Sequence, residues 1–325
     1  MTSTAGVGPA PPLDPELAGP LRGILAALPT PLTPELIADR RARTVVGSLT
    51  DDQIRRGGAF TVQELAVPGA APEVTLLVCR PTATPGPHPL VYNVHGGGMV
   101  AGNNRSDELA DELDRAEELQ LAVVAVNYRL APEHPAPNPV EDCYAGLVWV
   151  AAHAAELGFD GRIVVSGNSA GGTLAAGLAL LARDRNAPTL LGQMLQSPML
   201  DDRCDTPSAK QLADVGLWDG RSNQAGWTAL LGDRRGTAEV DAASAPARAV
   251  DLSGLPPLFV DVGAVESLRD DALAYTSRVW RAGGDAELHV WAGAFHSFDQ
   301  WVPAAAVSRA ARSARVDWLR RLLGT

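Results

Sequence analysis

A serine between two glycines is the first pattern in this chain that could do chemistry. Residues 167–171 read Gly-Asn-Ser-Ala-Gly, a strand pattern precedes them at Arg162–Ser166, and a helical pattern follows. In that context the G-x-S-x-G spacing is typical of a nucleophile elbow, where small residues let a strand turn sharply into a helix and expose the hydroxyl of Ser169. The helix N-terminus also favours a developing negative charge. The alternative is a glycine-rich turn with an ordinary capping serine.

A second run of small residues, His-Gly-Gly-Gly at residues 95–98, follows a predicted strand at Leu90–Val94. Glycines allow backbone N–H groups to approach a ligand closely. In acyl transfer, the N–H groups of this glycine run, with that of Ala170, would bind the oxyanion. The alternative is an anion nest for phosphate. That alternative is weak because the Gly-Lys-Ser/Thr ending of a phosphate loop is missing.

A serine hydroxyl needs a base, and His296 has the best position among the six histidines. It lies just after the last predicted strand, Glu287–Trp291, at the carboxyl edge where parallel sheets place their sites. It is also last in the chain order serine, acid, histidine that accompanies this elbow. We interpret the remaining histidines as structural or surface residues: His88, His95, His134, His153 and His289.

The acid that orients the histidine should follow the penultimate strand, and Glu266 lies there, after Leu258–Val262. Five aspartates are the alternatives, two of them one strand earlier: Asp201, Asp202, Asp261, Asp270 and Asp271. The histidines, cysteines and carboxylates do not repeat at metal-ligand spacing, so the sequence predicts no metal site.

The elements that must position these residues begin near residue 60, where apolar strand patterns start to alternate with helical patterns. This alternation predicts an α/β fold with a mostly parallel sheet covered on both faces. Two further strands, Phe60–Val67 and Val74–Cys79, could form an antiparallel pair. The other strands are expected at Leu90–Val94, Leu121–Asn127, Arg162–Ser166, Gln193–Gln196, Leu258–Val262 and Glu287–Trp291, and the helices at Ser106–Gln120, Pro139–Leu157, Ala170–Arg185, Ser267–Ala282 and Arg309–Leu323.

Two segments do not fit this alternation. Residues 1–50 are rich in proline and predict a partly loose tail with one or two helices. Residues 203–250 are polar and too long for a simple connection. Because neither segment has a core of its own, we expect both to join as a helical cap on a catalytic domain formed by residues 51–202 and 251–325.

The composition restricts the classes of function. The chain has 325 residues, 46% of them hydrophobic, which is enough for a large core. A net charge of −11 argues against binding to nucleic acid or anionic membranes. No apolar run reaches the roughly 18 residues of a membrane span, and residues 1–20 lack the features of a signal peptide. The three separated cysteines predict no disulfide framework, so we expect a cytoplasmic protein.

Taken together, the motifs resemble those of the bacterial hormone-sensitive-lipase-like esterases, which are α/β-hydrolases. The resemblance runs in family order from about residue 60 to the C-terminus. It rests on the segments 95–98, 128–135, 140–142, 167–172, 255–257, 268–270 and 293–298.

The resemblance implies an eight-stranded α/β-hydrolase fold and a cytoplasmic carboxylesterase, often homodimeric, that cleaves short- to medium-chain esters without a cofactor. The site residues that it implies are the nucleophile Ser169, the base His296, the acid Glu266, and the oxyanion-hole N–H groups of Gly97, Gly98 and Ala170.

The sequence departs from the family at two positions. The family most often has aspartate where Asn168 stands, and Asp-Pro at residues 266–267, which here are Glu-Ser. We expect Asn168 to have a tuning effect only, and Glu266 to keep the carboxylate on a longer arm. A lactonase or amidase with the same machinery is an alternative function. A non-catalytic ligand-binding homologue is another, although such a protein would be expected to lose a member of the triad.

Overall fold

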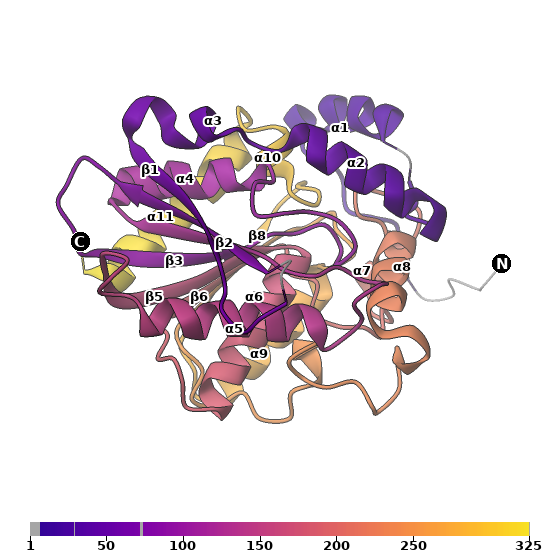
Figure 1. Ribbon diagram of the computed structural model, residues 1–325. Coiled ribbons are helices and arrows are strands. Elements are labelled where there is room, and N and C mark those ends of the chain that lie inside the picture. The colour runs from indigo at the N-terminus through magenta and orange to yellow at the C-terminus, as the bar shows by residue number, and fades with distance from the viewer. Residues whose placement is uncertain (1–6, 29, 72–73, 325) are drawn as a thin grey trace.

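A single eight-stranded sheet, with strand order β1-β2-β4-β3-β5-β6-β7-β8, organises the protein (Figure 1). The structure is a computed structural model that describes residues 7–28, 30–71 and 74–324. The strands are β1 (Phe60–Ala66), β2 (Thr75–Pro81), β3 (His88–Val94), β4 (Ala122–Asn127), β5 (Phe159–Asn168), β6 (Gly192–Gln196), β7 (Leu258–Gly263) and β8 (Ala286–Trp291). β2 is antiparallel to both β1 and β4, and the remaining pairs are parallel. The predicted antiparallel pair and the mostly parallel sheet are therefore confirmed.

Helices cover both faces of this sheet. The longer ones are α1 (Pro15–Ala27), α2 (Ile37–Gly47), α4 (Glu108–Leu119), α5 (Asn138–Ala152), α6 (Ala170–Asp184), α8 (Gly220–Leu231), α9 (Arg269–Arg281) and α11 (Ala306–Leu323). The short ones are α3 (Asp51–Arg55), α7 (Pro207–Gln211), α10 (Phe298–Trp301) and the 3₁₀ turns Pro34–Leu36, Arg56–Gly58, Gly232–Arg234 and Pro246–Arg248. None of the helices in the described ranges is both long enough and apolar enough to cross a membrane.

The alternation of side chains along the strands divides the core into two layers. Tyr92 and Val165 face one side and pack with α5, α6 and α9. Val91 and Val164, one residue away, face the other side and pack with α3, α4 and α11. Figure 1 shows α4 and α11 on one face of the sheet and α5, α6 and α9 on the other. This period of two is the one expected for strands buried on both faces.

Some boundaries differ from the predicted ones. α4 begins at Glu108 and is capped by the side chain of Asp107, whereas Ser106, the expected first residue, accepts a hydrogen bond from Asn103 N–H instead. α5 ends at Ala152, five residues before the predicted end. His88 is buried rather than solvated, because it begins β3 and pairs with Phe159 of β5.

The strand register aligns the ends of the strands from which the candidate residues emerge. Val94 of β3 is opposite Gly167 of β5, Asn168 is opposite Gln196 of β6, and Gln196 is opposite Asp261 of β7. The loops that follow β3, β5, β6 and β7 therefore meet at one edge of the sheet, which is where parallel sheets form their sites.

The N-terminal segment and the 203–250 insertion lie together beyond this edge, where Figure 1 shows α1, α2, α7 and α8. Leu32 N–H donates to Ser222 Oγ (2.9 Å), and the side-chain amide of Gln211 donates to the carbonyl of Gly8 (3.2 Å). Leu17 of α1 packs in one apolar cluster with Leu217 of the insertion. Residues 1–6 of the predicted loose tail lie outside the described residues.

Candidate active site

Ser169 lies in the sharp turn between β5 and α6, with φ 57° and ψ −119°. A non-glycine residue with positive φ is strained, and such strain is characteristic of functional turns. The neighbouring glycines make the turn possible. A Cβ at Gly167 would overlap the carbonyl of Gly171, and a Cβ at Gly171 would overlap the carbonyl of Val94. The local sequence therefore folds in the way that the G-x-S-x-G spacing predicts.

Two hydrogen bonds connect Ser169, His296 and Glu266. His296 Nε2 lies 3.0 Å from Ser169 Oγ, and His296 Nδ1 lies 2.8 Å from Glu266 Oε2. All three side chains are buried, and Glu266 is only 2% exposed. The three candidates come from loops after β5, β7 and β8, so residues 127 positions apart in the chain, Ser169 and His296, are in contact.

The carboxylate of Glu266 is fixed by two more donors. Its other oxygen, Oε1, accepts hydrogen bonds from Ser197 Oγ (2.8 Å) and from Gly263 N–H. Because these donors hold one oxygen, the other oxygen is oriented toward the imidazole. Ser197 follows β6, and sequence reasoning did not single it out.

The five alternative carboxylates have other surroundings. Asp270 accepts from Ser208 N–H (2.7 Å), and Asp261 accepts from the buried Arg315. Burial and the nearby Asp201 raise the pKa of Asp271 well above its usual value. The remaining two form ion pairs: Asp202 with Arg248 and Asp201 with Arg203. Of the six candidate carboxylates, Glu266 is the one that is hydrogen-bonded to His296 Nδ1 within the described residues.

The glycine run forms a loop beside the serine. Gly97 has φ 105° and Gly98 has φ 65°, conformations that side chains disfavour. Within the described ranges no acceptor takes the N–H groups of Gly97, Gly98 or Ala170. Three backbone donors without a partner near a serine hydroxyl are what an oxyanion site requires.

Neighbouring side chains hold this loop in place. The Glu108 carboxyl accepts a hydrogen bond from Gly96 N–H, and burial raises the pKa of Glu108 to about 8. Tyr128 OH donates to the carbonyl of His95 (2.9 Å), and the two rings stack. Burial lowers the pKa of His95 to about 4, which fits the structural role expected for this histidine. Sequence reasoning missed Glu108, whose only local signal is its place at a helix start.

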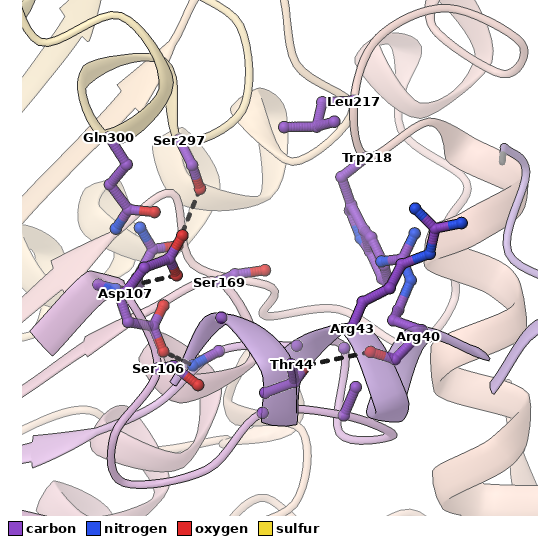
Figure 2. Close-up of a pocket in the computed structure, with 18 of the residues that line it drawn as sticks. Arg40, Arg43, Thr44, Ser106, Asp107, Ser169, Leu217, Trp218, Ser297 and Gln300 are labelled. Atoms are coloured by element: carbon purple, nitrogen blue, oxygen red, sulfur yellow. Dashed lines mark hydrogen bonds between the residues drawn. The ribbon is translucent and has the colours of Figure 1, made fainter. Parts of the chain in front are cut away.

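A cavity of about 290 Å³ opens above Ser169. In Figure 2, Ser169 lies between one group of side chains that includes Ser297 and Gln300 and a second group that includes Arg40 and Trp218. The cavity is therefore lined by α2 and by the insertion as well as by the loops of the sheet. The Trp218 ring lies 6.3 Å from the His296 ring, centroid to centroid. The sequence did not predict that Arg40 lines this cavity.

Comparisons with known proteins agree with the fold. Residues 91–300 match a family model described as the alpha/beta hydrolase fold. Esterase LipI of Mycobacterium tuberculosis is 36% identical over 236 residues, which are 70% of this chain and 72% of LipI. Carboxylesterase NlhH of the same species is 38% identical over 226 residues, which are 67% of this chain and 70% of NlhH.

Two solved structures are similar over nearly the whole chain. A bacterial heroin esterase has a TM-score of 0.85 at 38% identity, with 96% of this chain and 98% of that chain covered. Esterase LipW from Mycobacterium marinum has a TM-score of 0.85 at 32% identity, with 97% and 98% covered.

Proposed function

The chain belongs to the bacterial hormone-sensitive-lipase-like α/β-hydrolases and is a carboxylesterase, and we propose that it works through a Ser169–His296–Glu266 triad. The observation that carries the proposal is the hydrogen-bonded series from Ser169 Oγ through the imidazole to Glu266. In such a series a histidine acts as general base toward serine, and the carboxylate fixes its tautomer and orientation.

In the proposed mechanism Ser169 Oγ attacks the ester carbonyl and gives its proton to His296 Nε2. The N–H groups of Gly97, Gly98 and Ala170 bind the oxyanion of the tetrahedral intermediate. His296 then protonates the departing alcohol, which leaves an acyl group on Ser169. Water attacks this acyl-enzyme with His296 again as base, and the acid is released. Glu266 accepts the Nδ1–H bond throughout and offsets the charge of the imidazolium.

The substrates in this proposal are short- to medium-chain carboxylic esters. The cavity of about 290 Å³ is at the small end of small-molecule pockets, which span about 300–1,000 Å³. We also propose that residues 1–50 and 203–250 form a cap on a catalytic domain of residues 51–202 and 251–325. The contacts of α1, Leu32 and α2 with the insertion support this proposal. The cytoplasmic location and the homodimer stay predictions.

Covalent labelling tests the nucleophile. An organophosphonate should add one label, and mass spectrometry should locate it on Ser169. Ser169→Ala should not label, and it should lose about 10⁴-fold or more in kcat, because only binding and the oxyanion site remain. Burst release from a chromogenic ester by Ser169→Ala would remove Ser169 from the mechanism.

A panel of matched substrates separates the alternative functions. Matched ester, lactone and amide substrates of equal size should give the highest kcat/KM for the ester. A lactone or amide cleaved faster than its ester would replace the carboxylesterase assignment with the corresponding one. A protein that binds the ester without cleaving it would indicate a non-catalytic homologue.

A further inference from the structure

Arg40 brings a positive charge into the cavity that contains Ser169. It comes from α2, and its guanidinium carbon lies 5.6 Å from the centroid of the Trp218 ring. Figure 2 shows Arg40 and Trp218 on one side of the cavity and Asp107, Ser297 and Gln300 on the other, with Ser169 between them.

Within the part of the chain that the structure describes, the guanidinium of Arg40 has no hydrogen-bonding partner. Among the arginines in the described ranges that are not exposed, Arg40 is the one whose guanidinium forms neither an ion pair nor a hydrogen bond. By contrast, its neighbour Arg41 contacts Glu133 and the carbonyls of Val100 and Ala131. Burial lowers the pKa of Arg40, although a guanidinium remains charged in proteins. A cation with five N–H donors and no acceptor is a binding site for an anion.

The acidic residues nearby are engaged elsewhere. Asp39 pairs with Arg43 at 2.8 Å, and Asp219 accepts from Ser222 N–H at 2.7 Å. On the far side of the cavity, Asp107 caps α4 and Glu108 accepts from Gly96 N–H. Asp219 attracts Arg40 and offsets part of its charge, but within the described ranges no carboxylate forms an ion pair or hydrogen bond with the Arg40 guanidinium. The N–H donors of Arg40 therefore remain available to a ligand.

We propose that this esterase prefers esters that carry a carboxylate, which Arg40 binds while Ser169 attacks the ester carbonyl. The inference rests on the proposed function and specifies its substrate class. An arginine fork matches the geometry of a carboxylate, so two parallel N–H···O bonds can form. Arg40 and Ser169 line the same cavity of about 290 Å³. We therefore expect only a few carbon atoms between the carboxylate and the ester of the substrate.

The carboxylate could belong to the acyl group or to the alcohol, and matched substrates distinguish the two. For the acyl side, the pair is the p-nitrophenyl half-ester of glutaric acid and the p-nitrophenyl ester of glutaramic acid. For the alcohol side, the pair is O-acetyl-lactate and O-acetyl-lactamide. Within each pair the molecules have nearly the same size and differ in charge. A site built to bind a charged group discriminates strongly against an analogue that lacks it.

The readout is the ratio of kcat/KM for the charged ester to that for the neutral ester. In the wild-type protein this ratio should exceed one in one of the two pairs. Arg40→Met should lower it about 10- to 100-fold, the range of a hydrogen bond to a charged group. Arg40→Lys should lower it less, because the charge remains and the fork is lost. Glutarate should also inhibit the wild-type protein competitively and inhibit Arg40→Met more weakly.

Arg22→Met is the matched control, because Arg22 is an exposed arginine on α1 whose loss changes the net charge equally. Its ratio should equal that of the wild type. Wild-type ratios at or below one in both pairs, or an Arg40→Met ratio equal to the wild-type ratio, would overturn the proposal. In either case turnover of the neutral esters shows that the proposed function holds. If no ester of either pair is cleaved, the proposed function fails, and the inference fails with it.

Discussion

The indole ring of Trp218 lies directly against the α-carbon of Gly98, so that a Cβ at residue 98 would overlap the ring. The 203–250 insertion therefore contacts the glycine loop as well as enclosing the cavity. Since Gly98 also has φ 65°, both its conformation and this contact require glycine. The position of the proposed oxyanion donors thus depends on a residue 120 positions further along the chain.

Gly98→Ala should lower kcat by about 10²- to 10³-fold, the range for loss of one oxyanion donor. The added methyl group must move either the loop or Trp218, and the N–H of residue 98 moves with the loop. Gly57→Ala is the control, because Gly57 also has φ 65° but has open space around its Cβ position. Equal kcat values for Gly98→Ala and the wild type, measured with a chromogenic ester, would contradict the proposed role of this loop.

Glu266→Gln should lower kcat about 10²- to 10⁴-fold, as expected when the acid of a triad is replaced by its amide. The side-chain amide can present an N–H toward His296 Nδ1, which disfavours the tautomer that accepts the serine proton. Asp270→Asn is the matched control, because Asp270 binds Ser208 N–H and Arg269 instead of His296. A nearly wild-type Glu266→Gln enzyme together with an inactive Asp270→Asn enzyme would reassign the acid.

The order and type of the main elements could be predicted, because they depend on local patterns. Strand periodicity located all eight strands, and the elbow spacing located the turn at Ser169. The residues alone do not separate Glu266 from Asp270, because carboxylates in one loop and helix start look alike in sequence. Only the contact between Glu266 and His296, which belong to different loops, separates them.

The missed features all depend on contacts between distant segments. In the sequence, Arg40 is one more charged residue on an amphipathic helix. Its place in the cavity follows from the packing of α2 near Trp218. Glu108 reads as an acidic residue at a helix start, where the dipole favours it in any case. Its contact with Gly96 depends on how α4 packs beside β3. Neither contact leaves a periodic signal in the chain.

Glu108→Gln should make the protein more stable than the wild type at alkaline pH. Burial raises the pKa of Glu108 from 4.5 to about 8. Between these values the folded state keeps a proton that the unfolded chain has released, so the free energy of unfolding decreases as the pH rises through this window. Glutamine does not titrate, and its oxygen can still accept from Gly96 N–H.

The measurement is the melting temperature of the wild type and of Glu108→Gln at about pH 5 and about pH 9. These two pH values bracket most of the titration of Glu108. The difference in favour of Glu108→Gln should grow with pH. Glu156→Gln, at an exposed glutamate outside the site, is the control for the loss of a charge. A constant difference between Glu108→Gln and the wild type would show that Glu108 does not titrate in this range.

Deletion of residues 1–45 should destroy activity or change substrate preference while the sheet remains. The reason is that this segment supports the His296 loop. Asp14 N–H donates to the carbonyl of Gly293 (3.0 Å), and Leu17, which is fully buried, packs in one cluster with Phe295 and Phe298 on either side of His296. All the strands begin at or after Phe60, so the deletion removes none of them.

A displacement of about 1 Å at the base can cost about 10²-fold in rate, and we expect at least that loss in kcat/KM for the deleted protein. Circular dichroism should show the strand signal retained. Leu17→Ala, which leaves the chain intact and removes part of the same contact, should lose less activity than the deletion. Wild-type kinetics of the deleted protein on both small and bulky esters would mean that residues 1–45 contribute neither to the His296 loop nor to the pocket.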